Sequence, residues 1–271
     1  MNEEKKASIF THLLVYLSLF LFVMPFLWMI LASFKTQEQI LNTSALLSFT
    51  PNFDNYVNVF TQYAFMDFIV NSFIVALGST LLGLLLGLPA AYAIAKYKQQ
   101  GMGLLILVAR IVPGISFLIP WFIIFSKLEM IDTYTSLILS HMLVTMPFII
   151  WVMIPFFEGL PHELEESARV DGCTTTGAFL RILLPISWPG IITASILAFI
   201  FSWNNFMFSL ILAGEKTKTL PIAIFNFLSY SEINWGGLMA ASVIITLPVL
   251  VIALVAQRYI IAGLTGGAVK G

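Results

Sequence analysis

The sequence has little charge. Only 10% of its 271 residues are charged, 59% are hydrophobic, and the mean hydropathy is +0.95. A chain of this length cannot hide so much apolar surface in one water-soluble core, so we expect an all-α integral membrane protein surrounded by lipid. The net charge of -1 provides no basic surface, so we expect no nucleic-acid partner.

Residues with specific chemistry are also scarce. Cys173 is the single cysteine, which excludes an internal disulfide and a thiolate metal cluster. His141 has no second His, Cys or carboxylate at metal-ligand spacing, so we interpret it as a hydrogen-bonded core residue. No nucleophile and base pair stands out, and no G-x-x-x-x-G-K-[ST] loop is present to cradle ATP phosphates. We therefore expect no enzyme activity, catalytic residue, metal or bound cofactor in this chain.

Long apolar runs dominate what is present. A helix needs about 20 apolar residues to cross a bilayer. Six segments qualify as transmembrane helices, at 9–34, 68–95, 104–125, 135–157, 185–213 and 236–261. The first run is longer than the apolar part of a signal peptide, about 7 to 15 residues, and no cleavage site comes after it, so we expect a retained anchor. Within the second run, Gly83-x-x-x-Gly87 predicts a close approach to another helix.

The basic residues predict an orientation. The termini and the loops 96–101 and 158–184 carry eight Lys and Arg, against four on the opposite side. This bias predicts that both termini are cytoplasmic. We expect residues 1–67 to form the anchor and an aromatic-rich extracytoplasmic cap, residues 68–262 to form one membrane core, and residues 263–271 to form a cytoplasmic tail.

The inner loop 158–184 predicts its own local structure. Pro161 can begin a helix, and the acidic residues after it favour the positive end of the helix dipole. Gly172 can adopt the left-handed conformation that ends a helix, and the hydroxyls of residues 174–176 can cap a second one. We expect a helix, a tight turn and a second short helix.

The composition of the first of these helices suggests a contact with another protein. Ser167 and Ala168 are small enough to let it sink into a groove, while Glu166, Arg169 and Asp171 offer charged contacts at its edge. An amphipathic loop at the membrane surface is the alternative. The spacing Glu-Ser-Ala, three residues, Gly172, nine residues, then Ile-Leu-Leu-Pro disfavours that alternative.

This spacing resembles the EAA motif of permease subunits in binding-protein-dependent ABC importers, with Ser167 in place of the middle alanine. Further segments resemble the second permease subunit of maltose-type sugar importers, and the resemblance covers nearly the whole chain. These segments are Arg110 with Pro113 and Pro120, Trp203-Asn204-Asn205-Phe206, Thr219-Leu220-Pro221, Gln257-Arg258-Tyr259, Gly263-Leu264-Thr265 and Gly267-Ala268-Val269-Lys270-Gly271.

The resemblance implies a type I ABC importer permease fold in a bacterial or archaeal plasma membrane. Its partners would be a second homologous permease subunit, an ABC ATPase dimer that binds ATP and Mg, and an extracytoplasmic solute-binding protein that delivers a sugar. A glycerol phosphate or polyol stays open as the solute. The implied ATPase-coupling residues are Glu166, Ser167, Ala168, Arg169, Asp171, Gly172, Ile182, Leu184 and Pro185.

Two further groups are candidates for the solute pathway. Trp203, Asn204 and Asn205 offer a ring and amides that suit a sugar, although buried Asn also joins helices and Trp also anchors them. Arg110 is the one clear charge within a predicted span. It either snorkels to the headgroups or pairs structurally, or it lines the pathway.

Two other classes of protein are weaker alternatives. A secondary transporter driven by an ion gradient is expected to carry carboxylates within its spans, and these spans contain almost none. A membrane-embedded enzyme or scaffold with catalytic groups at depth would need paired residues that the sequence does not provide.

Overall fold

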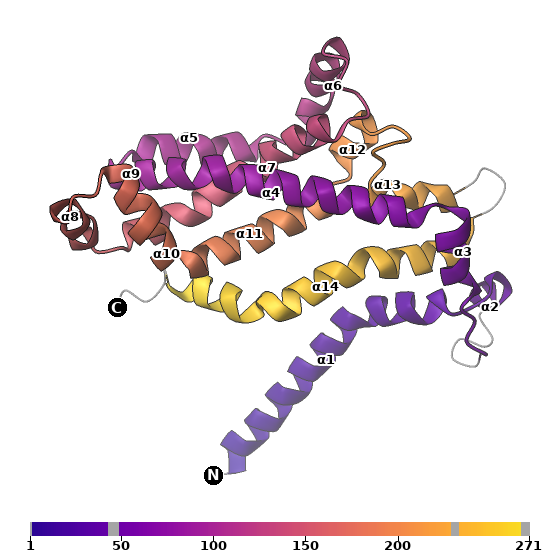
Figure 1. The fold of residues 1–271 in the computed structure, drawn as a ribbon. Coiled ribbons are helices and arrows are strands. Elements are labelled where there is room, and N and C mark those ends of the chain that lie inside the picture. The colour runs from indigo at the N-terminus through magenta and orange to yellow at the C-terminus, as the bar shows by residue number, and fades with distance from the viewer. Residues whose placement is uncertain (1, 43–48, 229–232, 267–271) are drawn as a thin grey trace. The chain divides into compact units, whose positions relative to one another are not determined.

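The computed structural model describes residues 2–42, 49–228 and 233–266, and within these ranges the chain is helical (Figure 1). The one β-type pairing in these ranges is an isolated bridge between Leu228 and Ile233. The all-α prediction is therefore confirmed for the described residues. The chain divides into two compact units, Met1–Phe65 with Ile224–Leu247, and Met66–Ala223 with Pro248–Gly271.

The first unit contains the predicted anchor helix. Its elements are α1 (Asn2–Ser33), α2 (Gln37–Leu41), α3 (Asp54–Gln62), η4 (Ile224–Phe227) and the first part of α14 (Trp235–Gly266). Most of the large hydrophobic side chains of α1 are exposed between Phe10 and Ile30. Such a surface suits lipid rather than water.

The segment after α1 is held by aromatic and polar contacts. The Phe34 ring packs against Phe53 and Tyr56, with 5.3 Å between ring centroids in both pairs. Asn55 Nδ2 donates a hydrogen bond of 2.9 Å to the carbonyl oxygen of Ser33 at the end of α1. These contacts make the segment between α1 and α4 a packed structure.

The second unit contains most of the helices. They are α4 (Phe65–Lys96, starting at the unit boundary), α5 (Gln100–Ile111), η2 (Gly114–Phe117), α6 (Leu118–Lys127), α7 (Tyr134–Glu158), α8 (His162–Val170), α9 (Thr175–Ala178), η3 (Phe179–Leu183), α10 (Leu184–Ile186), α11 (Trp188–Trp203), α12 (Met207–Leu212) and α13 (Leu220–Ala223). In Figure 1, α4, α7 and α11 run lengthwise together.

Small residues allow these helices to approach closely. A Cβ atom on Gly83 would lie 3.0 Å from Ile149 Cδ1, and one on Gly87 would lie 3.2 Å from Ile149 Cγ2, so α4 presses directly on α7. A Cβ atom on Gly190 would lie 2.7 Å from the Phe156 ring, which brings α11 equally close to α7. The close approach predicted from Gly83-x-x-x-Gly87 is confirmed.

Four described helices are long and apolar enough to cross a membrane, at Phe10–Ser33, Phe65–Lys96, Tyr134–Glu158 and Trp235–Gln257. They correspond to the first, second, fourth and sixth predicted spans. Thr175–Ile186 and Trp188–Trp203, bent by 78°, add a fifth if the pair is counted as one span. Residues 267–271 of the predicted tail lie outside the described residues, and the helix α14 extends to Gly266.

The other two predicted spans are not continuous helices. Residues 104–125 are divided, because α5 ends at Ile111 and the chain is extended at Val112 before Pro113. Proline lacks an N–H donor and disfavours helical geometry in the residue before it. The segment 185–213 is interrupted at Ser187 and again between α11 and α12. Six spanning helices are therefore not confirmed, because these two segments are each divided into shorter helices.

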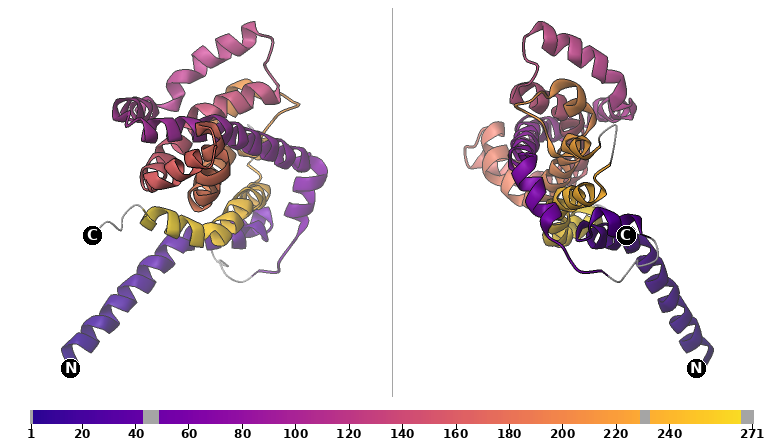
Figure 2. Two further views of the ribbon diagram at one scale, coloured as in Figure 1. Left: turned by 60° about the vertical axis from the view of Figure 1, so that its left-hand side comes forward. Right: turned by 90° about the vertical axis from the view of Figure 1, so that its right-hand side faces the viewer.

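The second unit has two distinct ends. Figure 1 shows α8 and α9 beyond one end of the lengthwise helices, and α12 and α13 at the opposite end. Figure 2 shows the same ribbon from two further directions. We call the two ends of the second unit the α8 end and the α12 end, and each carries a polar site.

Candidate functional site

At the α8 end the chain forms a helical elbow, defined as α8, Gly172, α9 and η3. Pro161 precedes α8, and Glu163 and Glu165 lie in its first turn, where the helix dipole favours negative charge. Gly172 has φ +86° and lets the backbone N–H of Cys173 donate to the carbonyl oxygen of Ala168 at 2.9 Å. The predicted helix, turn and second helix are confirmed.

The second helix is capped as expected. The Thr174 side chain accepts a hydrogen bond of 3.1 Å from the backbone N–H of Gly177. α9 then continues into η3, a π-helical turn in which Phe179 and Leu183 are buried. Ile182 and Leu184 are half-buried, and Pro185 is exposed just before the bend at Ser187. The Ile-x-Leu-Pro part of the motif thus leads the chain from the elbow into α11.

The two faces of α8 differ. Ala168 is 1% exposed and Leu164 packs at the edge of the hydrophobic core, so the small size of Ala168 serves packing within this chain. The outer face carries the exposed motif residues Glu166, Ser167, Arg169 and Asp171. It also carries Val170, which is 88% exposed. Sequence reasoning missed Val170 because a lone valine in a polar loop resembles ordinary helix packing.

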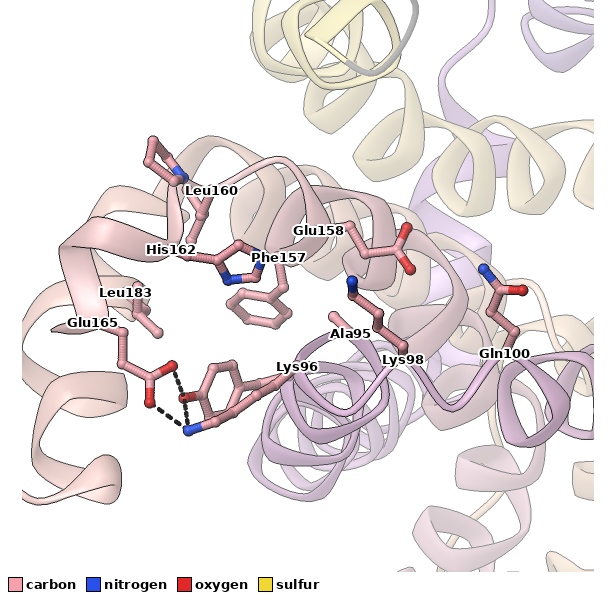
Figure 3. A pocket seen from close by; sticks show the side chains of 12 residues that line it. Ala95, Lys96, Lys98, Gln100, Phe157, Glu158, Leu160, His162, Glu165 and Leu183 are labelled. Atoms are coloured by element: carbon pink, nitrogen blue, oxygen red, sulfur yellow. Dashed lines mark hydrogen bonds and ion pairs between the residues drawn. The ribbon is translucent and has the colours of Figure 1, made fainter.

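The elbow is joined to α4 by a polar cluster. Lys96 forms an ion pair with Glu165, and Tyr92 Oη donates to Glu165 Oε2 at 2.9 Å (Figure 3). Burial alone raises the pKa of the Glu165 carboxyl, but the hydrogen bonds from Lys96 and Tyr92 outweigh it and hold the pKa below its usual range. Glu165 is therefore a carboxylate at neutral pH.

A pocket of about 360 Å³ lies beside this cluster. Its walls come from the ends of α4 and α7 and the start of α8, and they include Lys98, Glu158 and His162. Figure 3 shows Lys98 and Glu158 on one side of the pocket and the Lys96 and Glu165 pair on another. The pocket admits water to one side of the ion pair.

The predicted pathway residues lie at the break between α11 and α12. Trp203 is 2% exposed and its ring stacks on Phe199 with 5.8 Å between centroids. Asn204 is exposed, whereas the Asn205 side chain accepts a hydrogen bond of 3.2 Å from the backbone N–H of Phe208 in the first turn of α12. Of the three predicted residues, Asn204 presents the most accessible side chain.

Arg110 lies on aromatic rings. Its guanidinium carbon is 4.8 Å from the Phe148 ring centroid and 5.8 Å from that of Phe201. No carboxylate among the described residues forms an ion pair with Arg110. The half-buried charge is held by the faces of rings on α7 and α11, a type of contact worth about 2 kcal/mol when desolvated.

His141 is a core residue, as predicted. Its Nδ1 atom lies 2.7 Å from Ser202 Oγ, and the Ser79 hydroxyl donates to Ser202 Oγ at 2.9 Å. These contacts join α7, α11 and α4. They therefore hold the three helices together.

The α12 end has a polar site that sequence reasoning missed entirely. Asp132, in the loop between α6 and α7, accepts hydrogen bonds from the backbone N–H groups of Gly214, Lys216 and Thr217 at 2.9, 3.2 and 3.0 Å. The Thr217 hydroxyl adds a bond of 2.8 Å. Burial alone raises the pKa of the Asp132 carboxyl, but these donors lower it by more, so the pKa lies below its usual range.

The same loop is held from α4. Asn71 Nδ2 donates to the carbonyl oxygens of Lys216 and Lys218 at 3.0 and 2.9 Å, and Ser72 Oγ accepts from the Leu220 backbone N–H at 2.8 Å. No sequence signal could have shown this, because the partners are more than 80 residues apart. We call residues 214–220 the Asp132 loop.

The fold matches a known membrane transporter. A chain of a bacterial ABC transporter involved in the import of the acidic polysaccharide alginate superposes with a TM-score of 0.81, over 96% of this chain and 98% of that chain. The two sequences are 18% identical, so this likeness concerns the fold alone.

Sequence relatives are closer. The chain is 37% identical to the trehalose transport system permease protein SugB of Mycobacterium tuberculosis, over 92% of this chain and 93% of that protein. It is 34% identical to the trehalose/maltose transport system permease protein MalG of Thermococcus litoralis, over 100% of both.

Residues 83–266 match the family of binding-protein-dependent transport system inner membrane components, and the chain belongs to that family. It is therefore a multi-pass plasma membrane protein and a permease component of an ABC importer. The permease is a transport subunit rather than an enzyme, and it carries no cofactor itself.

Proposed function

We propose that this permease imports a sugar and that the elbow receives the driving force from a separate ATPase. The observation that carries the coupling is the exposed outer face of α8, which presents Glu166, Arg169 and Val170 on a helix fixed to the core by Ala168. The sugar is supported by the names of SugB and MalG, both trehalose permeases by name.

In this proposal the α8 end faces the cytosol. Both termini lie on that side and six crossings form the type I ABC importer permease fold, with α5 and α6 together forming one crossing and α11 and α12 another. The excess of Lys and Arg on the termini and on the loops 96–101 and 158–184 supports this orientation. The cap within residues 1–67 and the Asp132 loop then face outward, while residues 68–262 form the permease core and residues 263–271 the cytoplasmic tail.

The assembly we propose has three further kinds of component. A second permease completes the pathway, two ATPase subunits bind ATP and Mg, and an extracytoplasmic binding protein delivers the solute. Glu166, Ser167, Arg169, Asp171 and Val170 contact the ATPase. Ala168, Ile182, Leu184 and Pro185 hold the elbow in shape, and Gly172 makes its turn.

The solute pathway in this proposal passes the breaks in the fifth and third spans. Non-helical backbone at membrane depth is tolerated where it is buried in protein or lines a water-filled cavity. Asn204 is exposed at the break after α11, and Phe201, which contacts Arg110, lies one turn before it on the same helix. We propose that Asn204 and Asn205 line the pathway and that Arg110 sets its charge, with Trp203 packing behind them.

The test is uptake by the reconstituted complex. The chain, its partner permease, ATPases and binding protein are placed in proteoliposomes with ATP inside, and uptake of trehalose, maltose, a polyol and glycerol phosphate is compared. We expect ATP-dependent uptake of a sugar. If only glycerol phosphate or the polyol is taken up, that compound is the solute instead of a sugar. Uptake that depends on an ion gradient without ATP would contradict the proposed ATP-driven import.

Two substitutions test the elbow. Gly172→Pro forces φ to about -65° where the backbone needs +86°, and we expect at least about a ten-fold loss of solute-stimulated ATP hydrolysis. Glu166→Ala removes a charge from the outer face and should lower it by a smaller factor. Gly172→Asn, which tolerates the left-handed conformation, and Glu163→Ala on the same helix are the controls. Unchanged coupling in both test variants would contradict the proposed role.

A further inference from the structure

One α8 side chain connects this helix to the rest of the core by a polar contact. Within the described residues, Glu165 is the only α8 side chain with a hydrogen bond or ion pair to another element. Its partners Tyr92 and Lys96 lie four residues apart on α4, so they share one face of that helix. α4 precedes α8 in sequence by more than 60 residues, and the chain itself joins α8 to α7 and α9 instead.

Tyr92 extends the contact into the core. Its ring stacks on Phe179 of η3 with 4.8 Å between centroids, and it meets Phe157 at the end of α7 edge-on at 5.8 Å. Lys96 Nζ also donates to Tyr92 Oη at 3.3 Å. Tyr92 therefore stands where α4, α7, α8 and η3 converge.

We propose that Glu165, Lys96 and Tyr92 are positioning residues that make α4 move with α8 when the ATPases displace the elbow. This proposal rests on the proposed function and names a second route for the force. Without these contacts α8 acts on the core through its chain connections to α7 and to the bend before α11, and through the packing of Leu164 and Ala168. The contacts of Glu165 with Lys96 and Tyr92 attach α4 directly to α8.

The chemistry of the contact suits a link that must survive motion. Lys96 and Glu165 remain 22% and 17% exposed, and the adjoining pocket admits water. An ion pair of long side chains tolerates changes in angle better than packed apolar surfaces, whose contacts decay over about 1 Å. The lowered pKa of Glu165 shows that the folded protein favours its charged form.

The test compares transport with ATP use in the whole reconstituted complex. Glu165→Gln removes the charge but keeps the shape, and Lys96→Met keeps most of the methylene stem. We expect each to lower solute uptake per ATP hydrolysed by about five-fold, a typical size for one polar contact in a coupled network. Both single variants and the double variant lose the same contact. The uptake per ATP of the double variant should therefore lie within about two-fold of that of either single variant.

The controls separate coupling from folding. Glu163→Gln is the same change on the exposed face of α8, and Lys98→Met is the matched change two residues beyond α4. Both should keep uptake per ATP within about two-fold of the unchanged chain. Co-purification of the ATPase subunits with each variant measures assembly.

The outcomes are distinguishable. Wild-type uptake per ATP in both single variants, multiplied losses in the double variant, or loss of the ATPase subunits from the complex would each overturn the proposed link. If the unchanged chain shows no ATP-dependent uptake at all, the proposed function fails instead. A normal unchanged chain with uncoupled but fully assembled Glu165→Gln and Lys96→Met complexes supports the link.

Discussion

The two ends of the second unit are held by polar contacts of different kinds. At the α12 end, Asp132 accepts hydrogen bonds from three backbone N–H groups and one hydroxyl. At the α8 end, Glu165 accepts hydrogen bonds from the side chains of Lys96 and Tyr92. Backbone donors are fixed when the loop is folded, whereas long side chains can rotate. The first arrangement holds a loop in one conformation, and in our proposal the second keeps a helix attached while it moves.

This difference fits the proposed direction of force. A permease driven from one face needs a contact that can deform where the force arrives, here the α8 end. It needs a rigid contact where the core must keep its shape, here the α12 end. Gly214 of the Asp132 loop lies so close to Asp132 that an added Cβ would be 2.6 Å from Asp132 Cγ. This close approach contributes to the rigidity of the α12 end.

The largest effect on stability is expected at the α12 end. Asp132→Ala leaves four donors without their acceptor, and we expect a loss of about 3 kcal/mol in the free energy of unfolding. Thermal unfolding of the purified chain in detergent measures it. Glu129→Ala removes an exposed acid three residues earlier and should change little. Equal unfolding temperatures for Asp132→Ala and Glu129→Ala would contradict the stabilising role of Asp132 at the α12 end.

A smaller effect on stability is expected at the α8 end. Glu165→Gln removes a partly exposed ion pair, and we expect a loss of at most about 1 kcal/mol in the same thermal assay. Its consequence should instead be visible in uptake per ATP. A loss of stability as large as that of Asp132→Ala would mean that the α8 end is also rigid.

The smallest effect concerns pH. The pKa of Asp132 lies below its ordinary value of 3.8, so its contribution to stability is complete above that value and is lost as the pH falls through the lower folded-state pKa. Asp132→Asn should therefore show a shallower decline in unfolding temperature below about pH 4 than the unchanged chain. Unfolding scans between about pH 6 and pH 3 check this, with Glu129→Gln as control. Parallel curves for all three chains would contradict the assigned role.

Local features were readable from the sequence. Apolar run length placed α1, α4, α7 and α14, because a helix that crosses a bilayer must satisfy its backbone within itself. Gly172 and Thr174 marked the turn and the cap of the elbow, because each acts on neighbouring backbone. The side of α8 that Ala168 occupies was not readable: we expected Ala168 to fit a groove of another protein, but it is 1% exposed and packs within this chain.

Contacts between distant residues were not readable. Nothing near Asp132 indicates that its carboxylate meets Gly214, and nothing near Glu165 indicates Lys96, because these pairs form only when the helices pack. That the helices actually end near Pro113 and Asn204 was also not readable. Membrane helices tolerate proline and asparagine, so neither residue ends an apolar run by itself.

The π-helical turn at Phe179–Leu183 has a consequence for how this elbow can vary. Such a turn holds one residue more than a regular helix would need, and the extra residue is accommodated without rotating the adjoining helix. Deleting a single residue there would let the turn tighten into ordinary helix while α11 keeps its facing. Length changes between α8 and α11 can therefore be absorbed at this turn, and we expect natural or engineered one-residue deletions to be tolerated here sooner than in α8.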